Sequence, residues 1–183
     1  MSDTLNRYTA LAADFAARLE GTSPEQWSSP SPCTEWTARD VAAHVIGIQR
    51  RIVASATDAP PAGEPEEGED LAGAFKEAAG AVQVALADPA LAAKEVAGPF
   101  GKMPFEQIVG RIICTDILVH TWDLSRATGQ DEALDPMVVK GAFSGLKPLD
   151  AVIRRPGLFG PAVESSPDAD EQTQFLNFLG RTV

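Results

Sequence analysis

The pattern of apolar and polar positions is strongest between Pro104 and Thr128, where it predicts one long helix. Apolar residues recur there at spacings of three and four and so share one side, and a second apolar stripe runs beside the first. A helix that is apolar on two sides is expected to be largely enclosed by other helices. The first stripe nevertheless contains Asp116, His120 and Asp123. Buried carboxylates and imidazoles are costly unless they are paired, hydrogen-bonded or bound to a metal, so this stripe is the first candidate for function.

Three more helices are predicted before this long one. The first follows the apolar positions of 5–19, and Gly21 ends it. The second begins after a capping box at Thr37 and runs through 38–57, with His44 inside its apolar stripe. The third is alanine-rich and covers 71–86.

The connections and the C-terminal part give weaker signals. Residues 58–70 are acidic and proline-rich and are expected to form a loop. Residues 90–103 are expected to form either an extended crossing or a small hairpin. An Asp-Pro pair predicts a helix over 136–147, and the apolar residues of 175–179 predict a terminal helix that packs back onto the body.

These elements predict an all-α fold of four main helices, with the additional helices as cover. A chain of 183 residues with 44% hydrophobic content can bury its core as one domain. We therefore expect a single domain over 1–183, made of a bundle over about 3–129 and a helical extension over about 130–183.

Charge and hydropathy narrow the class of partner. The formal net charge of −11 argues against nucleic acid or an anionic membrane as the main partner. No apolar run approaches the length of a membrane span, and the first ten residues lack the pattern of a signal peptide. We therefore expect a soluble cytoplasmic protein.

The two cysteines, Cys33 and Cys114, are too few for a disulfide scaffold or a four-thiolate zinc site. Cys114 lies among isoleucines and is predicted to be a small core residue. Cys33 precedes a helix start with no base nearby in the sequence, so we expect a structural rather than a nucleophilic role.

Both histidines of the chain fall in apolar stripes of predicted helices, and each follows an aspartate four residues earlier, as Asp40–His44 and Asp116–His120. Residues at i and i+4 lie on one side of a helix, so a carboxylate and an imidazole there can bind one ion together. If the two helices are neighbours, His44 joins Asp116 and His120 in a three-ligand site with positions open for water or substrate, as in catalytic metal sites. Asp123 is a candidate hydrogen-bond acceptor for an imidazole N–H of such a site.

Simpler interpretations exist for the same residues. A histidine in an apolar stripe is usually a hydrogen-bonded core residue, and Asp40 is explained as the third residue of the capping box at Thr37. Trp36 and Trp122 either line a pocket or pack at the bundle ends. The Glu-x-x-His pattern of di-iron bundles is absent, so a dinuclear site is not expected. Spacing alone therefore leaves both a metal site and a hydrogen-bonded core open.

Three stretches carry a family resemblance. Residues 31–44, SPCTEWTARDVAAH, resemble the Pro-Cys-x-x-Trp…His segment of the DinB-like superfamily, and more narrowly the branch with the N-terminal domain of mycothiol-dependent maleylpyruvate isomerases. Residues 116–129, DILVHTWDLSRATG, resemble the second motif of that branch, in which a carboxylate stands four residues before a histidine that Trp-Asp-Leu follows. Residues 158–180 resemble the tail of the short single-domain members.

The resemblance implies a DinB-like four-helix bundle with extra C-terminal helices and one divalent metal held by His44, Asp116 and His120. Zinc is the first expectation, and nickel, iron and manganese also accept these ligands. The resemblance further implies that the metal activates a low-molecular-weight thiol, mycothiol or a similar one. The isomerases have glutamate at the position of Asp116 and carry a second domain for which this chain has no room. These departures speak against maleylpyruvate isomerase activity itself.

Two hypotheses about function follow. The first is a metal- and thiol-dependent transferase or isomerase that acts on a small electrophile. The second is a non-catalytic binding or stress-associated module that the metal only stabilises. A solvent-connected metal site favours the first, and a closed site with four protein ligands favours the second. Nucleic-acid repair, which the name of the superfamily suggests, is disfavoured by the negative charge.

Overall fold

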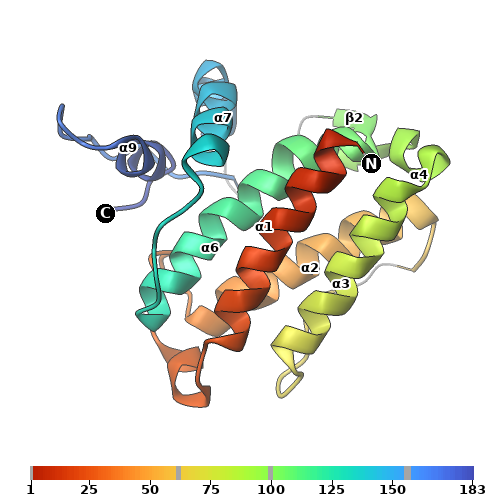
Figure 1. The fold of residues 1–183 in the computed structure, drawn as a ribbon, viewed down its shortest axis with the longest axis horizontal. Coiled ribbons are helices and arrows are strands. Elements are labelled where there is room, and N and C mark those ends of the chain that lie inside the picture. Colours follow the sequence, from red (N-terminus) through yellow and green to blue (C-terminus); the bar gives the residue numbers. More distant parts are fainter. Residues whose placement is uncertain (1, 61–62, 99–100, 155–157) are drawn as a thin grey trace.

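The computed structural model describes residues 2–60, 63–98, 101–154 and 158–183. Its body is a bundle of four long helices: α1 (Asp3–Glu20), α2 (Ala38–Thr57), α3 (Leu71–Ala87) and α6 (Cys114–Thr128). Both α1 and α2 pack on α3 and on α6, which closes the bundle (Figure 1). The predicted all-α fold with four main helices is therefore confirmed.

The bundle core receives large apolar side chains from every long helix. Phe15, Ile46, Phe75 and Ile117 are buried, and the rings of Phe15 and Phe75 lie 4.9 Å apart between their centroids. Each such side chain contributes about 1.5–3 kcal/mol when it leaves water. Cys114 is also buried in this core, as predicted.

Local signals set the helix ends. The Thr37 hydroxyl accepts a hydrogen bond from the Asp40 backbone N–H, and the Asp40 carboxylate accepts one from the Thr37 backbone N–H. This capping box begins α2, as predicted. A second capping box begins the short 3-10 helix η1 (Pro24–Ser28). Gly129 ends α6 with φ at 68°, a backbone conformation that glycine adopts without strain.

The long helix predicted from Pro104 is present, but it contains one irregular turn. The short helix α5 (Phe105–Ile108) continues into a π-helical turn, η2 (Val109–Ile113), and from there into α6. A π-helical turn closes its hydrogen bonds over one residue more than an α-helical turn. Apolar periodicity alone did not predict this turn.

Between α3 and α5 the chain forms α4 (Pro89–Ala93) and then a small antiparallel hairpin of β1 (Glu95–Gly98) and β2 (Gly101–Pro104). Of the two alternatives for 90–103, the hairpin is therefore the right one. Its residues 99–100 lie outside the described residues, as do residues 61–62 of the predicted loop between α2 and α3.

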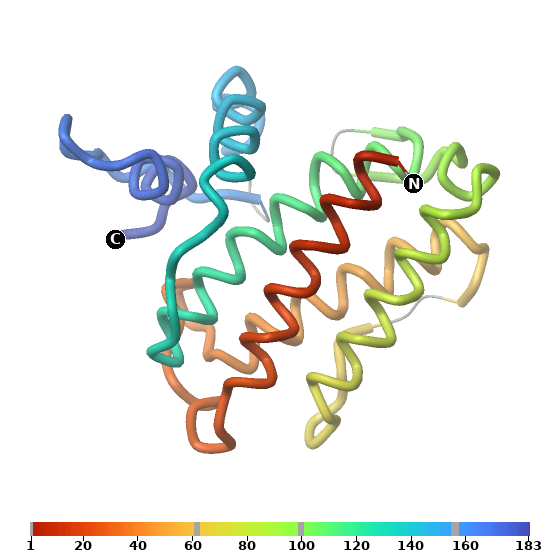
Figure 2. The backbone as a smooth tube through the Cα atoms, viewed as in Figure 1, coloured from red at the N-terminus to blue at the C-terminus, as the bar shows by residue number. Residues whose placement is uncertain are grey.

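The C-terminal extension adds α7 (Pro136–Leu146), η3 (Lys147–Leu149), α8 (Asp150–Ile153) and α9 (Glu171–Phe178). The helices α7 and α9 were predicted, whereas η3 and α8 were not. Figure 2 shows α7 and α9 on the α6 side of the bundle, away from α3 and α4. The Phe143 ring of α7 lies 5.9 Å from Phe175 and 5.5 Å from Phe178 of α9, so the two helices pack on each other. Among the described residues, no helix has the length and apolar composition that a transmembrane span needs.

Candidate metal centre

His44 on α2 faces Asp116 and His120 on α6. Nε2 of His44 lies 3.4 Å from Oδ1 of Asp116, and Nε2 of His120 lies 3.5 Å from the same oxygen. The two imidazole centroids are 5.0 Å apart. One possible ligand atom from each of the three residues lies within 4.8 Å of the other two. The packing of α2 on α6 thus brings together the three side chains that the sequence singled out.

The second carboxylate oxygen of Asp116 distinguishes this cluster from a finished hydrogen-bond network. Oδ2 is buried and has no hydrogen-bond partner in the described part of the chain. An unpartnered buried acceptor is costly, and such groups are rare in native proteins. Two imidazole nitrogens and a carboxylate oxygen are also a ligand set of catalytic zinc sites. The residues present therefore fit a divalent cation.

The cluster is reachable from solvent on one side. The side chains of His44 and Asp116 are 24% and 19% exposed, whereas His120 is 9% exposed. The Trp36 ring covers both histidines, with its centroid 4.9 Å from that of His44 and 6.0 Å from that of His120. Trp36 therefore lines the site. Trp122 is buried and packs under the Arg126 guanidinium instead.

Asp123 lies behind His120. Its Oδ2 is 2.9 Å from Nδ1 of His120, and the carboxylate is fully buried. A carboxylate at this distance accepts the Nδ1–H bond and so fixes the ring orientation and the tautomer. Nε2 is then the nitrogen that faces Asp116 and His44.

Arg181, close to the C-terminus, holds Asp123 from the other side. Its Nη2 lies 2.7 Å from Oδ2 and its Nε 3.2 Å from Oδ1, a two-pronged contact that matches the fork of the guanidinium. The Cys33 thiol donates to Oδ2 over 3.4 Å and accepts from Nη2 of Arg181 over 3.5 Å. No periodic pattern or motif in the sequence marks Arg181, so it was not predicted. The contact of Cys33 with Asp123 was not predicted either.

Burial and charge pull the pKa values of these groups in opposite directions. Burial raises the pKa of Asp116, but the charge and hydrogen bonds of His120 and His44 outweigh burial and hold it well below its usual value. Burial lowers the pKa of His120, and the Asp116 carboxylate raises it by more, well above the usual value. Burial also raises the pKa of Asp123, whereas His120 and Arg181 bring it down to about 2. Both carboxylates are therefore ionised at neutral pH, as metal ligation and a lasting ion pair require.

Asp40 and Arg126 form contacts outside the cluster. Asp40 is engaged in the capping box of α2 and is no partner of His44 in the structure. Arg126 pairs with Glu132 on the outer side of α6. The simpler explanation of Asp40 is therefore right.

Comparison with known proteins identifies the family of this chain. The family model described as the mycothiol maleylpyruvate isomerase N-terminal domain matches residues 8–125. The chain belongs to this family. It is also 34% identical, over 186 residues, to uncharacterized proteins from two strains of Mycobacterium tuberculosis, with 99% of this chain and 99% of each relative covered. No solved structure matches it.

Membership confirms the resemblance stated from the two motifs and the DinB-like interpretation of the bundle. The matched range contains His44, Asp116, His120 and Asp123, and it ends before α7. Arg181 therefore reaches the centre from outside the part of the chain that the family model covers.

Proposed function

We propose that this chain binds one divalent metal ion and uses it, with mycothiol or a similar low-molecular-weight thiol, to transfer a group to a small electrophile or to isomerise it. The observation that carries the proposal is the convergence of His44, Asp116 and His120 on a side that solvent reaches. Family membership supports the link to mycothiol.

The three ligands would be His44, Asp116 and His120. Zinc suits two imidazoles and a carboxylate best, and nickel, iron and manganese accept the same set. When bound, the cation supplies Lewis-acid chemistry: it favours the thiolate form of a thiol and polarises a carbonyl. The three protein ligands leave coordination positions for a thiol or a substrate.

The neighbouring residues prepare the ligands. Asp123 accepts the Nδ1–H bond of His120, which keeps Nε2 directed at the centre and makes it more basic. Arg181 neutralises Asp123 in its buried position and keeps it ionised. Trp36 shields the two imidazoles from water on one side and presents an apolar surface to the substrate.

Asp116 is shorter than the glutamate expected of the isomerases, and this changes the reach of the carboxylate and the metal preference. We further propose one domain over 1–183 and a cytoplasmic location, with no nucleic-acid or membrane partner. Side chains of the extension, among them Phe175 and Leu176, join the same apolar core as the bundle. The net charge of −11 disfavours polyanionic partners.

Metal analysis of protein purified without a histidine tag tests the ligands. We expect about one divalent ion per chain, and its loss in the His44→Ala/His120→Ala double variant. Asp40→Asn is the matched control, because Asp40 also precedes a histidine by four residues but serves only the capping box, so this variant should keep the metal. Equal metal in wild type and the double variant would overturn the proposed ligands.

Activity is tested separately. Metal-loaded protein is incubated with mycothiol and a panel of small electrophiles that includes maleylpyruvate, and loss of electrophile is followed. We expect turnover that needs both the thiol and the metal. Metal binding without turnover with any thiol would instead establish the second hypothesis, a metal-stabilised module without catalysis.

A further inference from the structure

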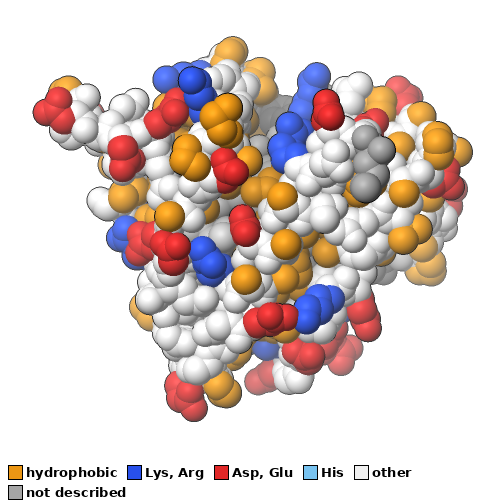
Figure 3. Space-filling view, viewed as in Figure 1, with side chains coloured by type: hydrophobic (Ala, Val, Ile, Leu, Met, Phe, Trp, Pro, Cys, Tyr) orange, Lys and Arg blue, Asp and Glu red, His pale blue; other side chains and the backbone are white. Residues whose placement is uncertain are grey.

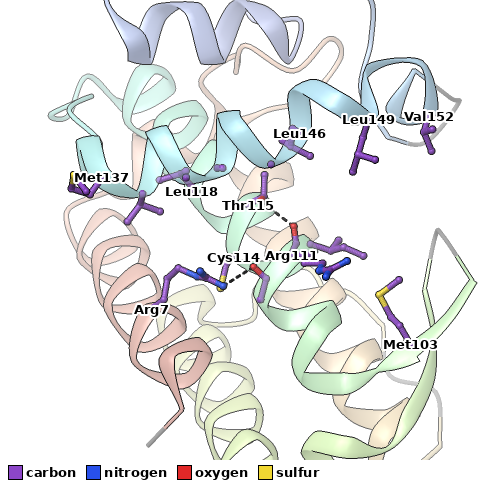
Figure 4. A pocket seen from close by; sticks show the side chains of 16 residues that line it. Arg7, Met103, Arg111, Cys114, Thr115, Leu118, Met137, Leu146, Leu149 and Val152 are labelled. Carbon is purple, nitrogen blue, oxygen red and sulfur yellow. Dashed lines mark hydrogen bonds between the residues drawn. The ribbon is translucent and has the colours of Figure 1, made fainter.

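A cavity of about 740 Å³ lies between the C-terminal extension and the bundle, in the size range of small-molecule sites. The segment from α7 to α8 forms one wall, with Met137, Leu146 and Leu149 (Figure 4). The opposite wall is built from α1, η2 and the start of α6. None of the 16 residues drawn around it belongs to the candidate metal centre.

The cavity and the metal centre use opposite sides of α6. Thr115 and Leu118 line the cavity, whereas Asp116 and His120 face α2. At 3.6 residues per turn, these two pairs point in nearly opposite directions. A ligand of the cavity would therefore not compete with the metal.

The cavity gathers apolar side chains that solvent reaches. The described residues include five exposed large hydrophobic side chains, and three of them, Met137, Leu149 and Val152, line it. Their exposed fractions are 75%, 40% and 40%. Hydrophobic side chains are visible on both sides of the gap between α7 and the bundle in Figure 3. Exposed apolar side chains that cluster around a concavity mark a binding site more often than isolated ones do.

Among the described residues that line the cavity, Arg7 and Arg111 are the only charged ones. Within the described part of the chain, no carboxylate pairs with either of them, and Arg7 donates only to the Gly110 carbonyl, over 2.9 Å, and to the neighbouring Cys114. In a chain with 26 acidic and 15 basic residues, two arginines without a carboxylate partner beside one cavity are a local excess of positive charge. Guanidinium groups bind carboxylates and other oxyanions in a two-pronged geometry.

Two glycines keep the α7 wall open. A Cβ atom added at Gly141 or Gly145 would have no neighbour within 4 Å. Glycine in a helix costs about 1 kcal/mol relative to alanine, so two of them on the cavity side of α7 lower the stability of that helix. Larger side chains at these positions would fill the cavity.

We propose that this cavity binds a small amphipathic carboxylate. The acyl or aromatic body of the ligand lies between α7 and the bundle, and its carboxylate lies against Arg7 and Arg111. The apolar walls would contact the body of the ligand, and the two arginines without carboxylate partners would bind its carboxylate.

Titration calorimetry of the full chain with octanoate tests this site, with octan-1-ol and acetate as comparison ligands. We expect saturable binding of octanoate to one site. Acetate and octan-1-ol should each bind at least about tenfold more weakly, because acetate lacks the apolar chain and octan-1-ol lacks the carboxylate. Gly145→Leu fills the cavity and should weaken octanoate binding by at least about tenfold. Arg111→Gln removes an exposed charge and should weaken it by about tenfold while leaving octan-1-ol unaffected.

Matched controls separate these effects from changes in folding. Gly80→Leu places the same side chain on α3, where a Cβ also meets nothing within 4 Å, and Arg51→Gln removes an exposed arginine of α2. Both should bind octanoate as the wild type does. Octanoate binding that is absent, or unchanged by Gly145→Leu and Arg111→Gln, would overturn the proposal. So would light scattering that shows a wild-type dimer and a Gly145→Leu monomer, because the cavity would then be covered by a second copy of the chain.

Discussion

Asp116 and Asp123 stand about two turns apart on the same side of α6, yet the protein treats the two carboxylates differently. Asp123 is fully buried, and both of its oxygens are bound, by His120, Arg181 and Cys33. Asp116 is 19% exposed, and its Oδ2 has no partner among the described residues. The chain thus satisfies one carboxylate completely and leaves the other with capacity for a ligand.

The partners of the two carboxylates also differ in kind. Arg181 is a permanent cation, so the Asp123–Arg181 pair is a fixed part of the structure. The partners of Asp116 are imidazoles, which can give up a proton and bind a metal through the same nitrogen. The permanent charge of Arg181 next to Asp123 stabilises the fold, whereas the imidazoles next to Asp116 can serve as metal ligands.

The largest expected effect is the loss of stability that Asp123→Ala causes in the metal-free protein. This variant leaves the largely enclosed Arg181 without a carboxylate partner and should lower the free energy of unfolding by about 3–5 kcal/mol. Asp116→Ala should cost less, because His120 can become neutral when its partner is lost, whereas a guanidinium cannot. Urea unfolding in the presence of a chelator measures both. Glu20→Gln, in the exposed pair with Lys76, is the control and should have almost no effect. Equal losses for the two aspartate variants would contradict the comparison.

Metal binding should depend on Asp116, the other carboxylate of the pair. Zinc at about a hundred times its dissociation constant should raise the free energy of unfolding by about 2.7 kcal/mol. Asp116→Ala should remove this gain, because it deletes a ligand. Arg181→Met should keep most of it, because the ligands themselves remain. The measurement is urea unfolding with zinc and with chelator. A gain that survives in Asp116→Ala would exclude Asp116 as a ligand.

Acid should weaken the fold through Asp123. Its pKa of about 2 in the folded chain lies below the unfolded value of about 3.9. A lowered carboxyl pKa stabilises the fold above the unfolded pKa, and this contribution of about 2–3 kcal/mol is lost as the pH falls from about 5 through the folded pKa. Unfolding free energies measured over this range with chelator should show the loss. In Arg181→Met the loss should be smaller, and an unchanged profile would mean that Arg181 does not hold the pKa down.

The smallest expected effect is that of Cys33→Ser. The hydroxyl can still donate to Asp123, which Arg181 and His120 also hold, so the free energy of unfolding should change by less than about 1 kcal/mol. Metal content and any thiol-dependent turnover should persist. If turnover disappears while metal content and stability stay the same, Cys33 takes part in the chemistry and belongs with the reactive cluster around Asp116.

The sequence predicted the parts of the fold that local patterns control. The apolar periodicity and the capping box at Thr37 placed both ends of α1, α2 and α3 to within two residues. They also placed the end of α6 at Thr128, whereas the helix predicted from Pro104 divides into α5, the π-helical turn and α6. The two Asp-x-x-x-His pairs, together with the packing of α2 on α6, also located the cluster of His44, Asp116 and His120.

What the sequence missed depends on contacts between distant residues. Arg181 lies 58 residues beyond Asp123, and no short-range pattern links the two. The cavity under α7 arises from the placement of the extension against the bundle, which periodicity does not determine. The π-helical turn escaped prediction because the apolar stripe continues through it on both sides.

That turn has a consequence for insertions and deletions in this part of the chain. If one residue were deleted within Val109–Ile113, the segment could wind as an uninterrupted α-helix with its phase nearly kept, because a π-helical turn holds about one residue more than an α-helical turn. If the segment instead became α-helical with all of its residues present, everything before it would rotate by up to about 100° relative to α6. Phe105 and Ile108 would swing out of the core and take the hairpin with them. The number of residues in this turn therefore sets the angular phase between the hairpin end of the bundle and the histidine cluster.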